Sequence, residues 1–246
     1  MQPALEVIGF SKDYEGAAAV QELTFSVAPG EILGLVGANG AGKTTTLRSI
    51  CGILPIQRGT VRIAGVDLVQ REREAKQNLA WIPDDPQPFE TLTVHEHLRF
   101  HAALYGVKDW QAHGDRLLER FELAHKRDAL GGELSRGMRQ KLALACAWLH
   151  QPRVVLMDEP LSGLDPRGIR SAKLAIQELA ASGSAVVLST HLLGLIEELA
   201  HRILILDNGR KIFEGTLDQA RSSLSVAPGS SLEEIFFAVT QPPSVP

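Results

Sequence analysis

The chain has 246 residues, of which 44% are hydrophobic and 22% are charged, so it can bury a core and is not a disordered segment. At about 150 residues per domain, this length predicts one compact α/β domain with an insertion. Lys and Arg number 25 against 29 Asp and Glu, and the net charge of −4 gives no electrostatic footprint for nucleic acid. Cys51 and Cys146 lie far apart among apolar residues, which excludes a disulfide framework and favours a reducing compartment.

No membrane span and no secretory leader are predicted. A spanning helix needs about 20 apolar residues, and the longest apolar run, Leu142 to Leu149, is bounded by Lys141 and His150. Residues 1–9 lack the basic and then apolar layout of a signal peptide. We therefore expect a cytoplasmic protein, and any membrane role must come from a partner.

Hydrophobic patterning predicts the strands in chain order. Alternation predicts strands at residues 5–10 and 23–27. After the Pro29-Gly30 turn, residues 31–36 form a nearly continuous apolar run, which is typical of a strand buried on both faces. Similar runs follow at 154–157, 185–188 and 203–206 and alternate with helical stretches. This alternation predicts an α/β fold with a mainly parallel sheet.

The segment from about Thr93 to His150 is expected to be an all-helical insertion, because it has few β-branched residues and no strand-like run. His95, His97 and His101 lie in its first helix, but no third ligand and no H-E-x-x-H order supports a metal site. We expect them on a solvent-facing helix. Near the C-terminus, residues 232–239 form one amphipathic segment, and residues 241–246 are expected to be disordered.

Residues 37–44 match the phosphate-loop pattern G-x-x-x-x-G-K-[ST], directly after a buried strand and before a helix predicted at 44–51. Gly40 and Gly42 allow backbone N–H groups to turn towards phosphate oxygens, and the helix N-terminus adds its dipole. Lys43 is expected to neutralise β/γ-phosphate charge, and the Thr44 hydroxyl to ligate Mg²⁺. An ordinary glycine-rich turn is the alternative, which this context disfavours.

The buried run at 154–157 ends in two carboxylates, Asp158 and Glu159. Parallel strands present their carboxyl ends to the ligand crevice. We expect Asp158 to reach Mg²⁺ directly or through water, and Glu159 to orient and deprotonate the attacking water. The alternative is a pair of solvated carboxylates that end a strand.

Residues 134–140, with the sequence LSRGMRQ, resemble the signature motif of ATP-binding cassette (ABC) transporter nucleotide-binding subunits, and the resemblance covers roughly residues 5–216. In that family, the helix that starts here points at the γ-phosphate held by the other protomer, and Ser135 is a suitable N-cap. Tyr14 resembles the aromatic that stacks on adenine, residues 162–165 resemble the loop that couples the two sites, and His191 resembles the γ-phosphate switch histidine. The resemblance implies nucleotide contacts from Tyr14, Gly37, Asn39, Gly40, Ala41, Gly42, Lys43, Thr44, Thr45, Ser135, Gly137, Met138 and Asp165.

Two positions depart from the family pattern. Asp84 stands where the family usually has Gln, in the loop that joins the core to the helical insertion, and Arg136 stands where it mostly has Gly. A carboxylate cannot donate a hydrogen bond, and it adds charge near Asp158 and Glu159. Asp84 is therefore expected to bind Mg²⁺ together with Thr44 and Asp158, or else to brace the loop towards a partner.

The resemblance implies a P-loop NTPase core with an N-terminal antiparallel β subdomain and an all-helical insertion. It divides the chain into an ATPase domain at 1–220, with core residues 1–84 and 151–220 and helical residues 85–150, and a tail at 221–246. It implies an ATPase that uses ATP and Mg²⁺, forms a head-to-tail dimer with itself or a homologue, and binds no nucleic acid. A separately encoded membrane permease is the expected partner, docked on residues 81–105 through Trp81, Phe89 and Phe100 at the cytoplasmic face of the membrane, in a system of exporter type.

Two other classes stay open. A cassette ATPase of translation or DNA repair would carry two cassettes or a long coiled coil, but the chain has one phosphate loop and no sustained heptads. An ATP-sensing, inactive half of a heterodimer would lack the catalytic carboxylate, but Glu159 is present. Asp84 is the one feature that favours this last class.

Overall fold

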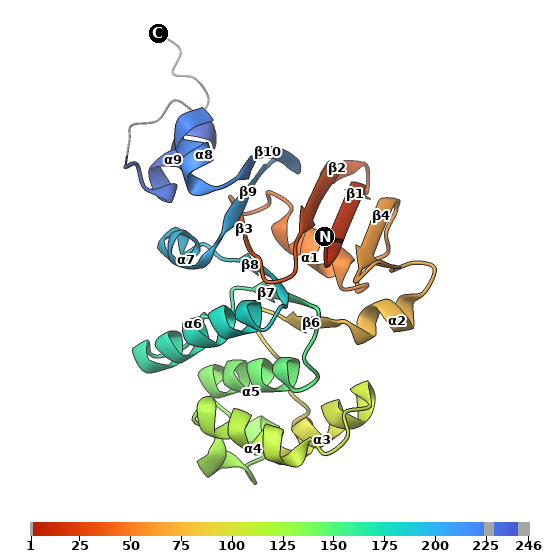
Figure 1. The fold of residues 1–246 in the computed structure, drawn as a ribbon, viewed down its shortest axis with the longest axis vertical. Helices are drawn as coiled ribbons and strands as arrows, with labels where there is room; N and C mark the ends of the chain where they lie inside the picture. The colour runs from red at the N-terminus through yellow and green to blue at the C-terminus, as the bar shows by residue number, and fades with distance from the viewer. Residues whose placement is uncertain (1, 224–228, 241–246) are drawn as a thin grey trace.

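The computed structural model describes residues 2–223 and 229–240. Its N-terminal part is a four-stranded antiparallel sheet in the order β2-β1-β4-β5 (Figure 1). The strands are β1 (Leu5–Tyr14), β2 (Ala17–Val27), β4 (Arg58–Ile63) and β5 (Val66–Asp67). This sheet agrees with the predicted antiparallel subdomain, although the sequence patterns did not locate β4 and β5.

The second sheet has six strands in the order β10-β9-β3-β8-β7-β6, and all neighbours are parallel except the β9-β10 hairpin. The strands are β3 (Ile32–Gly37), β6 (Leu79–Ile82), β7 (Val154–Asp158), β8 (Ala185–Ser189), β9 (Arg202–Asp207) and β10 (Arg210–Gly215). The apolar runs that predicted β3, β7, β8 and β9 are buried on both faces of this sheet. The two edge strands of this sheet, β6 and β10, lacked a sequence prediction.

Two hydrophobic clusters cover the faces of the parallel sheet. On one face, Leu33 and Leu35 of β3 pack with α1 (Lys43–Ile50) and with the antiparallel sheet. On the other face, Ile32 and Val36 pack with the remaining helices of the core. Those helices are α5 (Arg136–Leu149), α6 (Pro166–Ala181), α7 (Leu193–Leu199), α8 (Leu217–Ser223) and α9 (Leu232–Thr240). Helix α2 (Glu72–Gln77) precedes β6.

The helical insertion lies beyond α6, with α5 between the sheet and the two outer helices α3 (Val94–Tyr105) and α4 (Gln111–Arg120) (Figure 1). Thr93 starts α3 with a capping box, since its side chain accepts from the N–H of Glu96 while the Glu96 carboxylate accepts from the N–H of Thr93. Gly106 ends α3 in the left-handed conformation. Short 3₁₀ turns at Ala124–Lys126 and Gly131–Glu133 lead into α5.

The expectation that the α3 histidines face solvent is wrong. His97 is 4% exposed, and its Nδ1 lies 2.7 Å from the carbonyl oxygen of Thr93. His95 packs against Trp110, and His101 is half-buried beside Tyr105. Helix α3 therefore packs its imidazoles against other parts of the protein, which its composition did not reveal.

Helix α9 occupies the predicted amphipathic segment and contributes Leu232 and Ile235 to the core against α7. The prediction made for residues 241–246 falls outside the described residues. Among the described helices, none combines the length and apolar character that crossing a bilayer requires.

Candidate functional site

The phosphate loop connects β3 to α1, and its glycines are required by the backbone. Gly42 has φ +102°, and a Cβ there would lie 2.7 Å from the carbonyl oxygen of Ala19. Gly37 has no room for a side chain, since a Cβ would lie 2.6 Å from the carbonyl oxygen of Leu206. Asn39 and Gly40 are exposed, and the first turn of α1 contains no acidic residue. The loop therefore offers an open helix N-terminus that favours an anion.

Lys43 is folded over the loop. Its Nζ donates to the carbonyl oxygens of Gly37, at 2.6 Å, and Ala38, at 3.0 Å. Burial lowers the pKa of Lys43, while the nearby charges of Glu159 and Asp158 act in the opposite direction. An ammonium group that is partly desolvated and close to the loop backbone is well placed to meet phosphate oxygens.

Thr44 and Asp158 come together although 114 residues separate them. The Thr44 hydroxyl donates to Oδ2 of Asp158 at 2.8 Å. The strand order makes this possible, because β3 and β7 both pair with β8 and their carboxyl ends meet at one edge. Asp158 is 7% exposed, and burial raises the pKa of its carboxyl group. A bound cation would stabilise the charged form of this carboxylate, which burial disfavours.

This pair fits a Mg²⁺ ion that is bound together with substrate phosphates. Mg²⁺ is usually held by one or two carboxylates plus phosphate oxygens and water, not by an all-protein cage. The part of the chain that the structure describes contains no cluster of three or more His, Cys, Asp and Glu side chains that could hold a metal ion. The two oxygen donors present, Thr44 and Asp158, suit this mode.

Glu159 follows Asp158 in a left-handed backbone conformation, with φ 49°. Such a conformation is unusual outside glycine and is often found where function requires it. The Glu159 carboxylate accepts hydrogen bonds from the Thr190 hydroxyl at 2.7 Å and from the backbone N–H of His191 at 2.8 Å. Its Oε2 also lies 2.9 Å from Nδ1 of His191, whose side chain is 71% exposed. The carboxylate is therefore fixed in position at the strand end, beside an accessible imidazole.

Thr190 is the residue of this site that sequence reasoning did not assign. It is buried, and besides donating to Glu159 its hydroxyl accepts from the N–H of Leu192 at 3.1 Å. The signal was present in the sequence, as a hydroxyl residue directly after a buried strand and directly before His191. The sequence did not indicate which group this hydroxyl would contact, because Glu159 lies 31 residues away.

Ser135 and Asp165 both act as helix N-caps. At the start of α5, the Ser135 hydroxyl accepts a hydrogen bond from the N–H of Met138 at 3.3 Å, as predicted. Ser135 is exposed. Asp165 accepts from the N–H of Gly168 at 2.8 Å at the start of α6. Gly137 packs so closely on the loop before α6 that a Cβ would lie 2.9 Å from the carbonyl oxygen of Gly163. The two helix starts thus lie side by side.

Tyr14 ends β1 and is 43% exposed, so its ring is not taken up by the core. The Nζ of the buried Lys12 lies 5.6 Å from the centre of that ring. Thr45 lies half-buried in the first turn of α1, next to Thr44, and Ala41 is buried beneath the loop. Of the predicted nucleotide contacts, Tyr14, Asn39 and Gly40 are therefore exposed, and a second group lies at the adjoining starts of α5 and α6.

Asp84 and Arg136, the two departures from the family pattern, form an ion pair. Nη2 of Arg136 lies 3.0 Å from Oδ1 of Asp84, and it also donates to the Ser162 hydroxyl at 2.8 Å. Asp84 lies close enough to Asp158 for its charge to contribute to the raised pKa of that carboxyl group, after the larger effect of burial. Its predicted role as a metal ligand stays a prediction.

Comparison with known proteins agrees with this arrangement. The sequence family described as ABC transporter matches residues 20–162. Nod factor export ATP-binding protein I of Paraburkholderia xenovorans (strain LB400) is 38% identical over 216 residues, 87% of this chain and 71% of the relative. ABC-type transporter ATP-binding protein EcsA of Bacillus subtilis (strain 168) is 30% identical over 239 residues, 96% of each chain.

A solved structure of the ATP binding subunit of an ABC transporter superposes with a TM-score of 0.93 at 35% identity, covering 97% of this chain and 100% of that one. The phosphate loop, the carboxylates at the end of β7 and the capped start of α5 lie within this shared fold. The chain therefore belongs to the ABC transporter family, as one of its ATP-binding, ATP-hydrolysing subunits.

Proposed function

We propose that this chain hydrolyses Mg²⁺-ATP between two copies that associate head to tail, and that the cycle drives a separate membrane subunit. The observation that carries the proposal is the carboxylate of Glu159, fixed by Thr190 and His191 at the strand end that also presents Asp158 to Thr44. A carboxylate held in this way can orient a water molecule and accept its proton. Mg²⁺, when bound, supplies charge neutralisation at the phosphates.

In this proposal each residue acts at a stated atom. Nζ of Lys43 turns from the loop carbonyls to phosphate oxygens, and Thr44 and Asp158 hold the metal through their side-chain oxygens. Glu159 is the general base, and His191, which is exposed and already in contact with Glu159, faces the γ-phosphate. Tyr14 offers its exposed ring to adenine.

The head-to-tail dimer is supported by the start of α5. Ser135 caps this helix but lies exposed, and none of the hydrogen bonds among the described residues joins residues 134–138 to the phosphate loop. A helix start with free N–H groups favours an anion. We assign its anion to the ATP held by a second copy, with Gly137, Met138 and Asp165 next to it.

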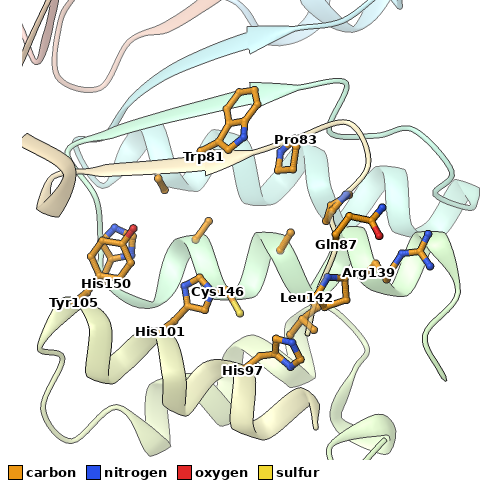
Figure 2. Close-up of a pocket in the computed structure, with 15 residues that line it drawn as sticks. Trp81, Pro83, Gln87, His97, His101, Tyr105, Arg139, Leu142, Cys146 and His150 are labelled. Carbon is orange, nitrogen blue, oxygen red and sulfur yellow. The ribbon is translucent and has the colours of Figure 1, made fainter. Parts of the chain in front are cut away.

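The surface for the membrane subunit is a groove between β6, α3 and α5 (Figure 2). It encloses about 210 Å³. Its lining includes Trp81 of β6, His101 and Tyr105 of α3, and His150 at the end of α5. Beside the groove, Phe89 is 55% and Phe100 is 42% exposed, and their ring centroids lie 5.3 Å apart. Exposed aromatic pairs beside a pocket are typical anchors of protein interfaces.

A relative that is described as a Nod factor export ATP-binding protein supports an export system. We propose on this basis that the chain acts at the cytoplasmic face of the membrane in an export system. Anchoring through Phe89 and Phe100 predicts that Phe89→Asp together with Phe100→Asp leaves ATP hydrolysis by the isolated chain intact and releases the chain from membranes of cells that express it.

The central test is the Glu159→Gln variant, which keeps the shape of the side chain and removes the base. Hydrolysis should fall by about 100-fold or more, a typical general-base contribution. The ATP-bound dimer should then accumulate and elute earlier from a sizing column with ATP and Mg²⁺ than without them. A variant that stays monomeric with ATP and turns over at the wild-type rate contradicts the proposal.

A further inference from the structure

Helix α5 begins with charges of the wrong sign for its own dipole. Its first turn carries Arg136 and Arg139 and no acidic residue, directly after the Ser135 cap. The N-terminus of a helix bears partial positive charge, so a cation there is unfavourable. Helix energetics alone therefore do not account for these two arginines, and their partners lie elsewhere in the chain.

Those partners are two successive aspartates in the loop after β6. Arg136 pairs with Asp84 at 3.0 Å, and Arg139 pairs with Asp85 at 3.4 Å. The arginines are three residues apart on the helix and so lie on the same face. The loop that leaves the parallel sheet is thus fastened to the start of α5 by two ion pairs.

Arg136 joins a third segment to this contact. The nitrogen that pairs with Asp84 also donates to the Ser162 hydroxyl at 2.8 Å, in the loop that follows Glu159. The aliphatic part of Arg136 packs on Gly163, where a Cβ would lie 3.1 Å from Cδ of Arg136. The side chain of Arg136 therefore links the start of α5 to the loop after β6 and to the loop after β7.

Stability does not explain the pair. The side chains of Arg136 and Asp84 are 47% and 50% exposed, and ion pairs with such exposure contribute little to the stability of the fold. The site offers another explanation, since the parallel pairing of β6 and β7 brings Asp84 and Asp158 to the same edge of the sheet, and Arg136 directly follows Ser135. A contact between these two points determines how the α5 start is oriented relative to the catalytic strand end.

We infer that Asp84 and Arg136 form a positioning pair that holds the start of α5, and with it Ser135, in register with the strand end that carries Asp158 and Glu159. The inference rests on the proposed function, because the orientation of Ser135 matters only if α5 meets ATP. It assigns to Asp84 an ion-pair partner within the chain, Arg136, instead of a place among the metal ligands.

The test is a double-mutant cycle on the full-length chain, with Asp84→Asn, Arg136→Gln and both together. Each single variant should lower kcat about three- to fivefold and leave the KM for ATP within about twofold, which is the scale of one exposed ion pair. The double variant should be no slower than the singles, because the contact can be lost only once. Asp84→Glu keeps the charge and should recover most of the rate.

A matched control is the ion pair of Arg71 and Glu74, which is similarly exposed and joins residues next to and within α2. Arg71→Gln and Glu74→Gln should leave kcat unchanged. Mg²⁺ titrations of wild type and Asp84→Asn should superimpose after scaling to the same maximum. A several-fold shift of the Mg²⁺ midpoint would make Asp84 a metal ligand and overturn the inference, as would rate losses that multiply in the double variant.

A second measurement separates this inference from the proposed function. Hydrogen–deuterium exchange of peptides covering residues 135–150 and 160–166 should rise equally in both single variants and no further in the double variant. If wild type hydrolyses no ATP but the exchange follows this pattern, the proposed function fails and the positioning pair stands. Exchange that is unchanged in every variant overturns the positioning pair.

Discussion

His191 and Glu159 are in direct contact, with Nδ1 of the imidazole 2.9 Å from Oε2 and the backbone N–H of His191 2.8 Å from Oε1 of the carboxylate. Glu159 directly follows β7, and it accepts hydrogen bonds from the segment that follows β8. The neighbouring strands β7 and β8 place both residues at one edge of the sheet, where Asp158 pairs with Ser189. The carboxylate of Glu159 is therefore oriented by the segment that follows the neighbouring strand β8.

Thr190→Val should slow hydrolysis without weakening ATP binding. Valine has nearly the same shape as threonine but cannot donate to Oε2 of Glu159, so the carboxylate loses one of its fixed contacts. A hydrogen bond to a charged group contributes about 1.5–3 kcal/mol, and we expect kcat to fall about tenfold or more at an unchanged KM. Steady-state ATPase assays check this, with the exposed Thr91→Val as control. A lower kcat in both variants, or in neither, would contradict the role of Thr190.

Lys43→Ala should weaken ATP binding. The substitution removes the ammonium group that lies over the phosphate loop, and a charge-assisted contact of this kind contributes about 1.5–3 kcal/mol. The dissociation constant for Mg²⁺-ATP should therefore rise about 10- to 100-fold in a fluorescence titration. Lys108→Ala, at an exposed position between α3 and α4, serves as the control. Equal affinity of the Lys43 variant and wild type would remove the phosphate loop from the proposal.

Gly42→Ala should destabilise the fold as well as the site. Gly42 has φ +102°, and a Cβ would lie 2.7 Å from the carbonyl oxygen of Ala19. A strained φ of this kind costs about 1–3 kcal/mol, which urea denaturation can detect. In Gly194→Ala, the new Cβ meets nothing within 4 Å in helix α7, so this variant should be as stable as wild type or slightly more stable. Equal midpoints for the two variants would contradict this account of the loop.

Acidification should destabilise the fold through His150. This side chain stacks on Tyr105 at 3.7 Å between ring centroids, and burial lowers its pKa to about 4, against an opposing hydrogen bond to the carbonyl oxygen of Leu79. The folded state therefore binds fewer protons than the unfolded state between pH 4 and 6.5. The stability that this histidine contributes is complete above pH 6.5 and is lost as the pH falls towards 4.

His150→Gln tests this relation. From pH 7.5 to pH 5, wild type should lose up to about 2 kcal/mol more unfolding free energy than the variant does. Urea denaturation at the two pH values measures the difference, and the exposed His125→Gln is the control, which should behave as wild type. A loss of the same size in wild type and in His150→Gln would assign the pH response to other groups, of which His101, whose pKa is also lowered by burial to about 4, lines the same groove.

Features encoded within a few consecutive residues could be read from the sequence. The phosphate loop, the Asp158-Glu159 strand end and the Ser135 cap each depend on local turn chemistry and hydrophobic period, and the structure has all three where they were predicted. The buried strands β3, β7, β8 and β9 were predictable for the same reason. The short strands β4, β5 and β6 gave too weak a period to be located.

Contacts between distant segments were decided by the tertiary structure. Thr44 meets Asp158 across 114 residues, Thr190 meets Glu159 across 31, and Arg136 meets Asp84 across 52. No local pattern encodes these pairs, because they depend on the order in which β3, β8 and β7 pair and on how α5 packs below β6. The burial of His97 has the same origin, since a helix side becomes interior only when another element covers it. The sequence by itself determined which groups the site contains, and packing determined which of them touch.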